Sequence, residues 1–480
     1  MTGIKEVILY GCGKRCRRIY DYLKKNNHIK VIYMIDSNPD RWGSDFCGYK
    51  ISSPEVLRRV NKLPLCITVA DYDAICEIRK TLQEEYSYEM QNEIFYDELM
   101  INAFYGMENV QGVLSSVSSI RNGRKRIVFD CSFGLGLGGI EEWVKNLCAE
   151  LLRVEWKNIC ILTDYAEYDI VPILTEIVEK VKIVHNVQFV EENVLNIIKF
   201  LCQRLPCKVV ANHVDEVMIA AGVIKEFFPQ QIEIASVIHG GDLNNYSRQI
   251  SMKRYIDLYV GVSEDIVREM RQRGIEKSRI FHMTCPVECK ETLHRGYTVN
   301  KQKKIKLGYA GRLVEKQKRV DLLLKMLDQL EKLQVNYELE IAGEGDGKKD
   351  IVCFINDNFL EKKVKLLGTL ERVQIPSFWS RQDVCINIAD YEGRSISVME
   401  AMANGTVPVV TATSGMREDI KDGENGYIVN VGDYIAMAEK IKYIDEHREM
   451  LPQMGAAAHN VIYPKVQMGD HLRFWEKILV

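Results

Sequence analysis

Short apolar runs alternate along the chain with longer stretches in which hydrophobic residues recur at helical spacing. The run DVCINIA at 383–389 is apolar and flanked by polar residues, which is the pattern of a buried parallel strand. The stretch at 314–330 instead places its apolar residues along one face of a helix. Strands of the first kind followed by helices of the second predict an α/β fold with parallel sheets.

The segment that follows residues 383–389 shows one such unit in detail. After a loop, Ser395 can cap a helix through residues 395–404, and Gly405 can end that helix. Residues 406–411 (TVPVVT) then have the composition of the next strand. The predicted order is strand, loop, helix, strand.

Two glutamates, Glu392 and Glu400, flank the predicted helix N-terminus, with seven residues between them. The backbone N–H groups of Arg394, Ser395 and Ile396 should point out of the helix end, where a diphosphate is electrostatically favoured. Glu392 lies in the loop beside that site. Glu400 lies about one and a half turns into the helix, where its carboxylate could accept hydrogen bonds from two vicinal hydroxyls. The arrangement suits a nucleoside diphosphate sugar, and a solvated helix is the alternative.

This segment resembles the E-x7-E motif of the family 4 glycosyltransferases, which are retaining enzymes with the two-domain fold called GT-B. The resemblance implies that Glu392 contacts hydroxyls of the transferred sugar. It implies that Glu400 contacts the ribose of the nucleotide.

Residues 304–313 (KIKLGYAGRL) predict a strand that ends in a Gly-Arg turn. In the family, a lysine after this turn opens a helix, so Arg312 and Lys318 would neutralise the diphosphate as it departs. The lysine comes one residue later here than is usual, and Arg319 occupies the place of the usual glycine. Lys316 is therefore an alternative to Lys318.

Three more pieces follow the family order between residues 337 and 429. The first is a turn that would line the nucleotide pocket, the second a strand and short helix that would close over the base, and the third a stretch after the E-x7-E helix. The matching residues are Gly343, Glu344, Gly345, Gly368, Ser414, Gly415 and Glu418.

The partner domain of this fold should begin near Arg126 with a strand, a glycine-rich turn and an amphipathic helix. Gly138 and Gly139 resemble the family's Gly-Gly-x-Glu turn, where backbone can approach the donor phosphate or the acceptor. His239 ends a later strand, where open α/β sheets bind ligands, so we expect it to contact donor sugar or acceptor. A purely structural histidine is the alternative. Ser263, followed by Glu264, resembles the family's helix-opening serine.

The first 115 or so residues are not required by the family. Residues 5–36 predict a strand, a glycine turn, a helix and a second strand that ends in Asp36, as in nucleotide-binding βαβ units. The turn has the form G-x-G-x-x-C because Cys16 replaces the third glycine. The region resembles Rossmann-like modules attached to polysaccharide-biosynthesis proteins. It is a candidate regulatory domain or docking domain for a protein partner, with nucleotide binding as an alternative.

These assignments predict the domain organisation. The predicted parts are a Rossmann-like accessory domain at 1–114, a linker at 115–125, a GT-B N-terminal acceptor domain at 126–300, a GT-B C-terminal donor domain at 301–465 and a helix at 466–480 that crosses back to the acceptor domain. The predicted fold is thus GT-B, with two facing Rossmann-like domains after an additional α/β domain.

Composition agrees with three domains that have cores of their own, since 46% of the 480 residues are hydrophobic. A net charge of −3 gives no general attraction to nucleic acid. We expect a cytoplasmic protein without a signal peptide, and a basic stretch at 248–273 could contact the inner face of the membrane. The 14 cysteines show no paired spacing typical of zinc sites or disulfides, so neither zinc nor a disulfide framework is indicated. We expect a nucleoside diphosphate sugar as the donor substrate, and neither a cofactor nor a metal ion.

The function predicted from these features is transfer of a hexose-type sugar from a nucleoside diphosphate sugar to a hydroxyl acceptor, with retention of configuration, in surface polysaccharide or glycoconjugate synthesis. The acceptor would be a sugar, a lipid-linked molecule or a protein. Three alternatives remain open. They are a sugar-nucleotide epimerase of the same fold, a non-catalytic sugar-nucleotide sensor or scaffold subunit, and an oxidoreductase that uses the first domain.

Overall fold

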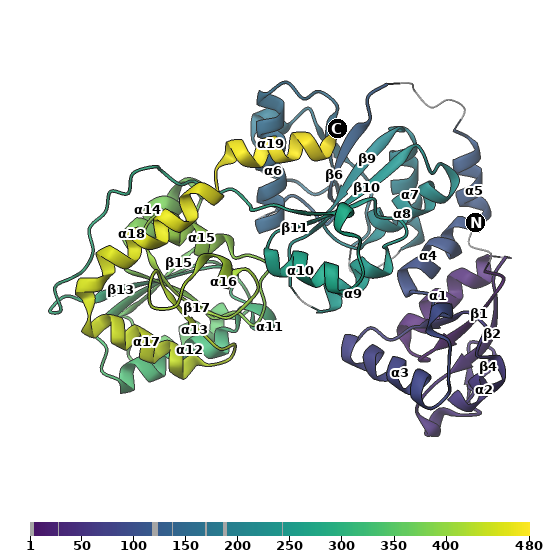
Figure 1. Ribbon diagram of the computed structural model, residues 1–480, viewed down its shortest axis with the longest axis horizontal. Helices are drawn as coiled ribbons and strands as arrows, with labels where there is room; N and C mark the ends of the chain where they lie inside the picture. Colours follow the sequence, from purple (N-terminus) through teal and green to yellow (C-terminus); the bar gives the residue numbers. More distant parts are fainter. Residues whose placement is uncertain are drawn as a thin grey trace. The chain divides into compact units, whose positions relative to one another are not determined.

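A computed structural model describes residues 4–26, 28–117, 123–136, 138–168, 170–185, 190–241 and 243–480. It has the α/β architecture expected from the sequence (Figure 1). The chain divides into two compact units. The first comprises Met1–Val237, Leu243–Tyr259 and Arg273–Ile280, and the second comprises Ile238–Asp242, Val260–Gln272 and Phe281–Val480.

The first unit begins with a small α/β part built on three parallel strands in the order β2-β1-β5. Buried apolar residues of the strands, among them Ile8 and Leu65, form its core with Leu82 of the flanking helix α3. Its main elements are β1 (Glu6–Tyr10), α1 (Lys14–Lys25), β2 (Lys30–Ile35), β5 (Leu65–Ile67), α3 (Tyr72–Glu84), α4 (Tyr96–Tyr105) and α5 (Glu108–Ser115).

A seven-stranded sheet follows, in the order β12-β11-β10-β9-β6-β7-β8. Strand β6 (Arg126–Cys131) is an interior strand of this sheet and pairs in parallel with β7 (Ile159–Thr163) and β9 (Cys207–Ala211). The other elements of this region are α6 (Gly139–Arg153), β8 (Val178–Lys180), α7 (Glu191–Cys202), α8 (Glu216–Phe227), β10 (Ile232–Ile238), α9 (Leu243–Ser251), β11 (Leu258–Gly261), α10 (Glu264–Gln272) and β12 (Ile280–His282).

The second unit is built on a six-stranded sheet in the order β15-β14-β13-β16-β17-β18, in which every pair is parallel. Figure 1 shows α12, α13 and α17 on one side of this sheet and α14, α15 and α18 on the other. The strands are β13 (Ile305–Ala310), β14 (Tyr337–Ala342), β15 (Val364–Gly368), β16 (Val384–Asn387), β17 (Val407–Thr411) and β18 (Tyr427–Val429). The helices are α12 (Val320–Lys332), α13 (Lys348–Asp357), α14 (Ile375–Ser380), α15 (Ile396–Ala403), α17 (Tyr434–Glu446) and α18 (Leu451–Ile462).

Around the E-x7-E segment, the observed elements follow the prediction closely. The predicted strand, helix and strand are β16, α15 and β17. Helix α15 ends at Ala403, and Gly405 then takes a positive φ of 69°, a conformation that favours glycine.

The helical stretch predicted at 314–330 is not one helix. The structure divides it into α11 (Glu315–Lys318) and α12, because Arg319 between them has the left-handed angles φ 52° and ψ 58°. A single residue with positive φ leaves the spacing of apolar residues unchanged. The sequence pattern therefore predicted one continuous helix.

The predicted domain boundaries stay a prediction, including the crossing of the last helix. The N-terminal α/β part and most of the seven-stranded region belong to one compact unit. Helix α19 (Met468–Leu479) belongs to the second unit, where Nδ1 of His471 lies 3.2 Å from the carbonyl oxygen of Thr284.

Candidate active site

Turns at the carboxyl ends of β13 and β14 are held together by glycines in the second unit. Gly343, with φ 141°, lies so close to the β13 turn that a Cβ there would be 1.9 Å from the carbonyl oxygen of Gly311. The N–H of Gly343 donates to the carbonyl of Gly368 at 2.8 Å, which ties in the end of β15. These backbone contacts exclude a side chain at 343 and fix three adjacent turns at one sheet edge.

The same turns place two predicted donor-site side chains at this edge. The N–H of Leu313, next to Arg312, donates to the carbonyl of Glu344 at 2.9 Å. Gly368 has φ 70°, and a Cβ there would be 3.3 Å from Oε1 of Glu344. Arg312, Glu344 and Gly368 are therefore neighbours at one sheet edge.

Lys318 and Glu392 form an ion pair between Nζ and Oε1. Their side chains are only 14% and 9% exposed, so water screens their charges weakly. Asn387, the last residue of β16, donates its amide to Oε1 of Glu392 at 3.3 Å and to Oγ of Ser395 at 3.1 Å. The structure thus brings together one predicted cation, one predicted carboxylate and the residue at the start of α15. Lys316, the alternative cation, is exposed.

Arg312 approaches the same loop through Gln317. Nη2 of Arg312 donates to Oε1 of Gln317 at 2.7 Å, and Nε2 of Gln317 donates to the carbonyl of Tyr391 at 3.2 Å. The N–H of Asp390 donates to the backbone carbonyl of Gln317 at 2.9 Å. Gln317 was not identified from the sequence, since a lone glutamine in a charged stretch gives no signal.

Arg319 is a second connection between the region of α11 and α12 and the loop that carries Glu392. Its Nη1 donates to both carboxylate oxygens of Asp390, at 2.8 and 2.9 Å, and its Nε and Nη2 donate to Asp321 at 2.9 and 3.0 Å. These bonds hold an arginine in the left-handed conformation at the position where the family usually has glycine.

Helix α15 begins as predicted, with Ser395 at its N-cap. The Ser395 side chain does not cap the helix, because its hydroxyl is bonded to Asn387 and lies 3.2 Å from Oγ of Ser397. Across the described ranges, no hydrogen bond is recorded from the backbone N–H groups of Arg394, Ser395 or Ile396. They retain the capacity to bind an anion at a helix N-terminus, as the sequence predicted.

The Arg394 side chain forms hydrogen bonds with other residues of the second unit. Its Nε and Nη2 donate to the two carboxylate oxygens of Asp419 at 3.0 and 2.7 Å, and its Nη1 donates to Oγ1 of Thr284 at 2.7 Å. The guanidinium is 3% exposed. Any contact of Arg394 with a donor would therefore come from its backbone, as predicted, because the side chain anchors the start of α15.

Glu400 lies on α15, partly accessible, on the side near Arg372 and Trp379. Burial raises the pKa of Glu400 from its ordinary 4.5 to about 7, and the charge of Arg372 and the indole of Trp379 lower it by less. A carboxyl group that is half protonated near neutral pH can both donate and accept hydrogen bonds, which suits contacts with two hydroxyls.

Residues from the last predicted piece meet the predicted serine-opened helix. Oε1 of Glu418 accepts hydrogen bonds from the N–H groups of Glu264 at 2.6 Å and Asp265 at 3.3 Å, at the start of α10. Oγ of Ser263 lies 3.1 Å from Oγ of Ser414. Burial raises the pKa of Glu418, and these N–H groups oppose that rise because they favour the carboxylate.

The segment from His239 to Gly241 lies against the Glu392 loop within the second unit. A Cβ on Gly393 would be 1.9 Å from the carbonyl oxygen of His239, and one on Gly241 would be 2.8 Å from the carbonyl oxygen of Glu392. Two glycines thus permit close backbone contact, and the predicted His239 follows directly after β10. Its contact with a sugar or acceptor stays a prediction.

Gly138 and Gly139 belong to the first unit, as the N-cap and the first residue of α6. A Cβ on Gly138 would be 2.1 Å from Oε2 of Glu141, so the glutamate of the predicted Gly-Gly-x-Glu turn folds back over it. The predicted contact of these glycines with donor phosphate or acceptor remains a prediction.

The polar groups around the N-terminal glycine turn form hydrogen bonds with one another. Oδ2 of Asp36 accepts from the N–H of Cys12 at 2.9 Å and from Nη1 of Arg41 at 2.7 Å. Nη2 of Arg41 donates to the carbonyl of Cys12 at 2.6 Å. In dinucleotide-binding folds, an acidic residue at the end of the second strand binds a ribose. Here that residue is Asp36, and its carboxylate is paired with Arg41 instead.

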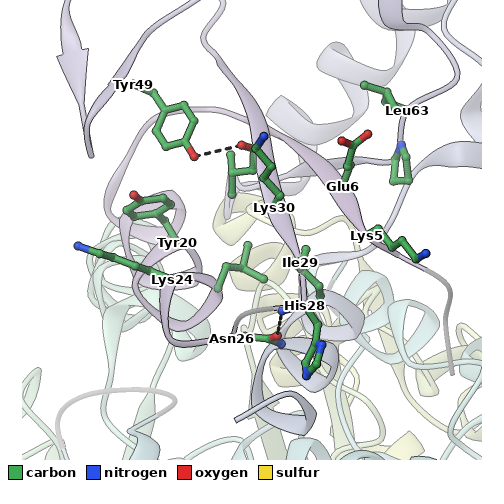
Figure 2. A pocket seen from close by; sticks show the side chains of 13 residues that line it. Lys5, Glu6, Tyr20, Lys24, Asn26, His28, Ile29, Lys30, Tyr49 and Leu63 are labelled. Atoms are coloured by element: carbon green, nitrogen blue, oxygen red, sulfur yellow. Dashed lines mark hydrogen bonds between the residues drawn. The ribbon is translucent and has the colours of Figure 1, made fainter. Parts of the chain in front are cut away.

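The N-terminal part also carries an open hollow of about 790 Å³, at the amino ends of β1 and β2 (Figure 2). None of the predicted donor-site residues lines it. Tyr20 and Tyr49 meet there edge to face with ring centroids 5.7 Å apart, and the Tyr49 hydroxyl donates to the carbonyl of Val31 at 3.1 Å. Asn26 donates to the carbonyls of Asn102 and Ala103. These polar groups support the fold.

Two properties of the described residues concern metal sites and membrane spans. Within those ranges, His, Cys, Asp and Glu side chains do not gather in groups of three or more as metal ligands would. None of the helices described there has both the length and the apolar content required to cross a bilayer.

Two segments of the chain match models of known protein families. Residues 290–461 match the model of the family described as Glycosyl transferases group 1. Residues 3–94 match a second model, described as C2185-like, N-terminal. The first match covers the six-stranded sheet and every predicted donor-site residue between Arg312 and Glu400.

Three known proteins illustrate the similarity. N-acetyl-alpha-D-glucosaminyl L-malate synthase of Bacillus anthracis is 22% identical over 278 residues, which are 54% of this chain and 71% of that protein. Poly(ribitol-phosphate) alpha-N-acetylglucosaminyltransferase of Staphylococcus aureus (strain COL) is 29% identical over 173 residues, and the chain spans only 34% of its length. HepE of Anabaena, in complex with UDP and glucose, superposes with a TM-score of 0.59 and 15% identity over 74% of this chain and 99% of that one.

The structural likeness confirms the GT-B fold class expected from the sequence. The matched family and the names of the relatives support a glycosyltransferase.

Proposed function

We propose that this protein transfers a hexose-type sugar from a nucleoside diphosphate sugar to a hydroxyl acceptor, with retention at the anomeric carbon, during polysaccharide or glycoconjugate synthesis. The observation that carries the proposal is the constellation at the start of α15. There, unbonded backbone N–H groups adjoin the Lys318–Glu392 ion pair, with Glu400 further along the same helix. UDP is the first nucleotide to test, because HepE is known in complex with UDP and glucose.

Each group has a defined task in this proposal. The N–H groups of Arg394, Ser395 and Ile396 bind the diphosphate, and Lys318 and Arg312 stabilise the negative charge that develops on it as the glycosidic bond breaks. Glu392 orients the sugar hydroxyls, and Glu400 binds the ribose. The departing diphosphate accepts the acceptor's proton, so no protein nucleophile is required. No metal ion is assigned a role.

The decisive experiment compares Glu392→Gln and Arg312→Ala with the unmodified chain, with donor consumption and product formation followed by NMR. Arg312→Ala should lower the transfer rate by about 10²–10³, because it removes one cation that stabilises the leaving group. Glu392→Gln should remove most activity as well. Near-normal rates in either variant would refute the assignment of that residue.

Glu424→Gln provides a matched control, because Glu424 is an exposed carboxylate whose recorded partner is Lys421 at 3.7 Å. It should transfer sugar at the normal rate. The anomeric proton coupling of the product distinguishes retention from inversion. Isomerised donor without acceptor would instead indicate an epimerase, and donor binding without turnover would indicate a sensor.

A further inference from the structure

The start of α15 lacks the side-chain cap that usually fixes a helix N-terminus. A capping side chain accepts a hydrogen bond from the N–H of the second or third helical residue, which fixes the backbone but also occupies a donor. Ser395 holds the N-cap position, and its hydroxyl makes no such bond. The backbone of this turn is therefore fixed by other contacts.

The side chain of Arg394, one residue before the N-cap, supplies these contacts. It forms a bidentate pair with Asp419, in which Nε and Nη2 donate to the two carboxylate oxygens at 3.0 and 2.7 Å. The third nitrogen, Nη1, donates to Oγ1 of Thr284 at 2.7 Å. A planar guanidinium that is bound through all three nitrogens has little freedom to rotate, so these bonds fix the position of the whole residue.

Close packing along the stem of Arg394 transmits this constraint to the backbone. A Cβ on Gly415 would lie 3.1 Å from Cγ and 3.2 Å from Cβ of Arg394, and 3.0 Å from the carbonyl oxygen of Gly393. Gly415 is held in turn, because its N–H donates to Oδ2 of Asp265 at 3.1 Å. The Arg394 side chain is thus confined at both ends, and the orientation of the backbone N–H at 394 depends on it.

Asp419 is a buried anchor with a second cation of its own. Its side chain is 5% exposed, and its Oδ1 also accepts from Nζ of Lys465 at 2.8 Å. Lys465 donates in addition to the carbonyl of Glu418 at 2.7 Å, and Oε2 of Glu418 lies 3.5 Å from Nη1 of Arg394. Two cations and two carboxylates formally balance, so this cluster adds little net charge to attract an anion.

We propose that Arg394 and Asp419 are positioning residues for the diphosphate of the donor. Their pair takes the place of a helix cap, because it aims the N–H groups of residues 394–396 and leaves all of them to the anion. The inference rests on the proposed function, which puts the diphosphate at this helix end. It deepens that function by assigning the preference for a nucleoside diphosphate over a nucleoside to these two side chains.

The test measures how much the diphosphate contributes to binding by the full chain. Direct and displacement calorimetry gives the dissociation constants of UDP and uridine, and of GDP and guanosine. The constant of the nucleoside divided by that of its diphosphate is the diphosphate preference. Arg394→Lys keeps the charge but loses the bidentate geometry, so it should lower this preference about tenfold while nucleoside binding is retained. Asp419→Asn should lower it as well.

Arg448→Lys is the matched control. Arg448 is another buried arginine of the second unit, with Nε donating to Oδ1 of Asp445 at 3.0 Å and Nη1 donating to the carbonyl of Lys303 at 2.8 Å. Lys303 precedes β13, so these contacts lie at the amino end of that strand, whereas the diphosphate site is at the carboxyl ends of the strands. Arg448→Lys should lower the thermal stability as Arg394→Lys does, and leave the diphosphate preference unchanged.

Three outcomes would overturn the proposal. These are an unchanged preference in Arg394→Lys, an equal loss in Arg448→Lys, and a higher preference in Asp419→Asn, which would mean that the guanidinium acts through its charge. Should Asp419→Asn fail to fold, Arg394→Lys decides alone. Failure of the proposed function has a different signature, because neither UDP nor GDP would then bind the unmodified chain.

Discussion

At the scale of single residues, Arg319 shows how this chain departs from the family that it resembles. Left-handed angles are costly for a residue with a Cβ, by roughly 1–2 kcal/mol, and glycine avoids this cost. Here the bonds to Asp390 and Asp321 offset the strain and attach the start of α12 to the loop before Glu392. Compared with glycine, arginine at this position is conformationally strained, but its side chain connects two segments of the candidate site, the start of α12 and the loop before Glu392.

This account predicts opposite orders of stability at two nearby positions. Arg319→Gly should be more stable than Arg319→Ala by about 1 kcal/mol, because both lose the ion pairs but only the alanine retains the strain. At Lys316, within α11, Lys316→Ala should instead be more stable than Lys316→Gly by about 1 kcal/mol, since that position is helical. Urea unfolding of the four variants measures both differences in free energy of unfolding. If the alanine variant were the more stable at both positions, the backbone at Arg319 would not be strained.

At the scale of elements, the sequence was most informative where hydrophobic periodicity and turn residues agree. The strand at 383–389, the helix after Ser395 and the stop at Gly405 were predicted from local patterns and are observed. The break at Arg319 was missed, because periodicity continues through it.

The contacts that assemble the candidate site were also beyond sequence reasoning. Gln317 and Asp419 contact partners that lie 74 and 25 residues away along the chain and that only folding brings together. Asn387 contacts Glu392 and Ser395, which lie only five and eight residues further along the chain. Asn387 gave the one available signal, as a polar residue within an apolar strand. The roles assigned to the predicted site residues remain predictions.

Helix α15 carries a second prediction, which concerns Glu400. Its pKa of about 7 lies above the ordinary 4.5, so the folded state binds the proton more tightly than the unfolded state. Its contribution to stability is complete below about pH 4.5 and is lost as the pH rises through 7. The total is on the order of 3 kcal/mol at 1.36 kcal/mol per pKa unit.

Glu400→Gln removes this proton linkage. Relative to the unmodified chain, the variant should therefore gain free energy of unfolding between pH 5 and pH 8, by roughly 2–3 kcal/mol. Urea unfolding of both proteins at the two pH values measures the change. Glu424→Gln should show no such dependence, because the Glu424 side chain is exposed. A constant difference between Glu400→Gln and the unmodified chain would show that Glu400 ionises normally in the folded state.

At the scale of the whole molecule, the N-terminal α/β part is joined to the seven-stranded region inside one compact unit. Helix α4 packs on α8, and buried Asp97 accepts hydrogen bonds from Oγ of Ser251 at 3.0 Å and Nη2 of Arg248 at 3.3 Å. These contacts join the core of the N-terminal part to that of the seven-stranded region. We therefore expect the first unit to unfold cooperatively.

Gly222 on α8 tests that expectation. A Cβ there would lie 2.3 Å from Cδ1 of Ile101 on α4, so Gly222→Ala should destabilise the chain by about 1–3 kcal/mol. Ile101→Val removes Cδ1, and the double variant should recover on the order of 1 kcal/mol relative to the sum of the single changes. Gly112→Ala, on α5 with nothing within 4 Å of its Cβ, should be neutral or stabilising. Additive effects of the first two substitutions would mean that α4 and α8 do not pack as one core, and the N-terminal part would then unfold separately.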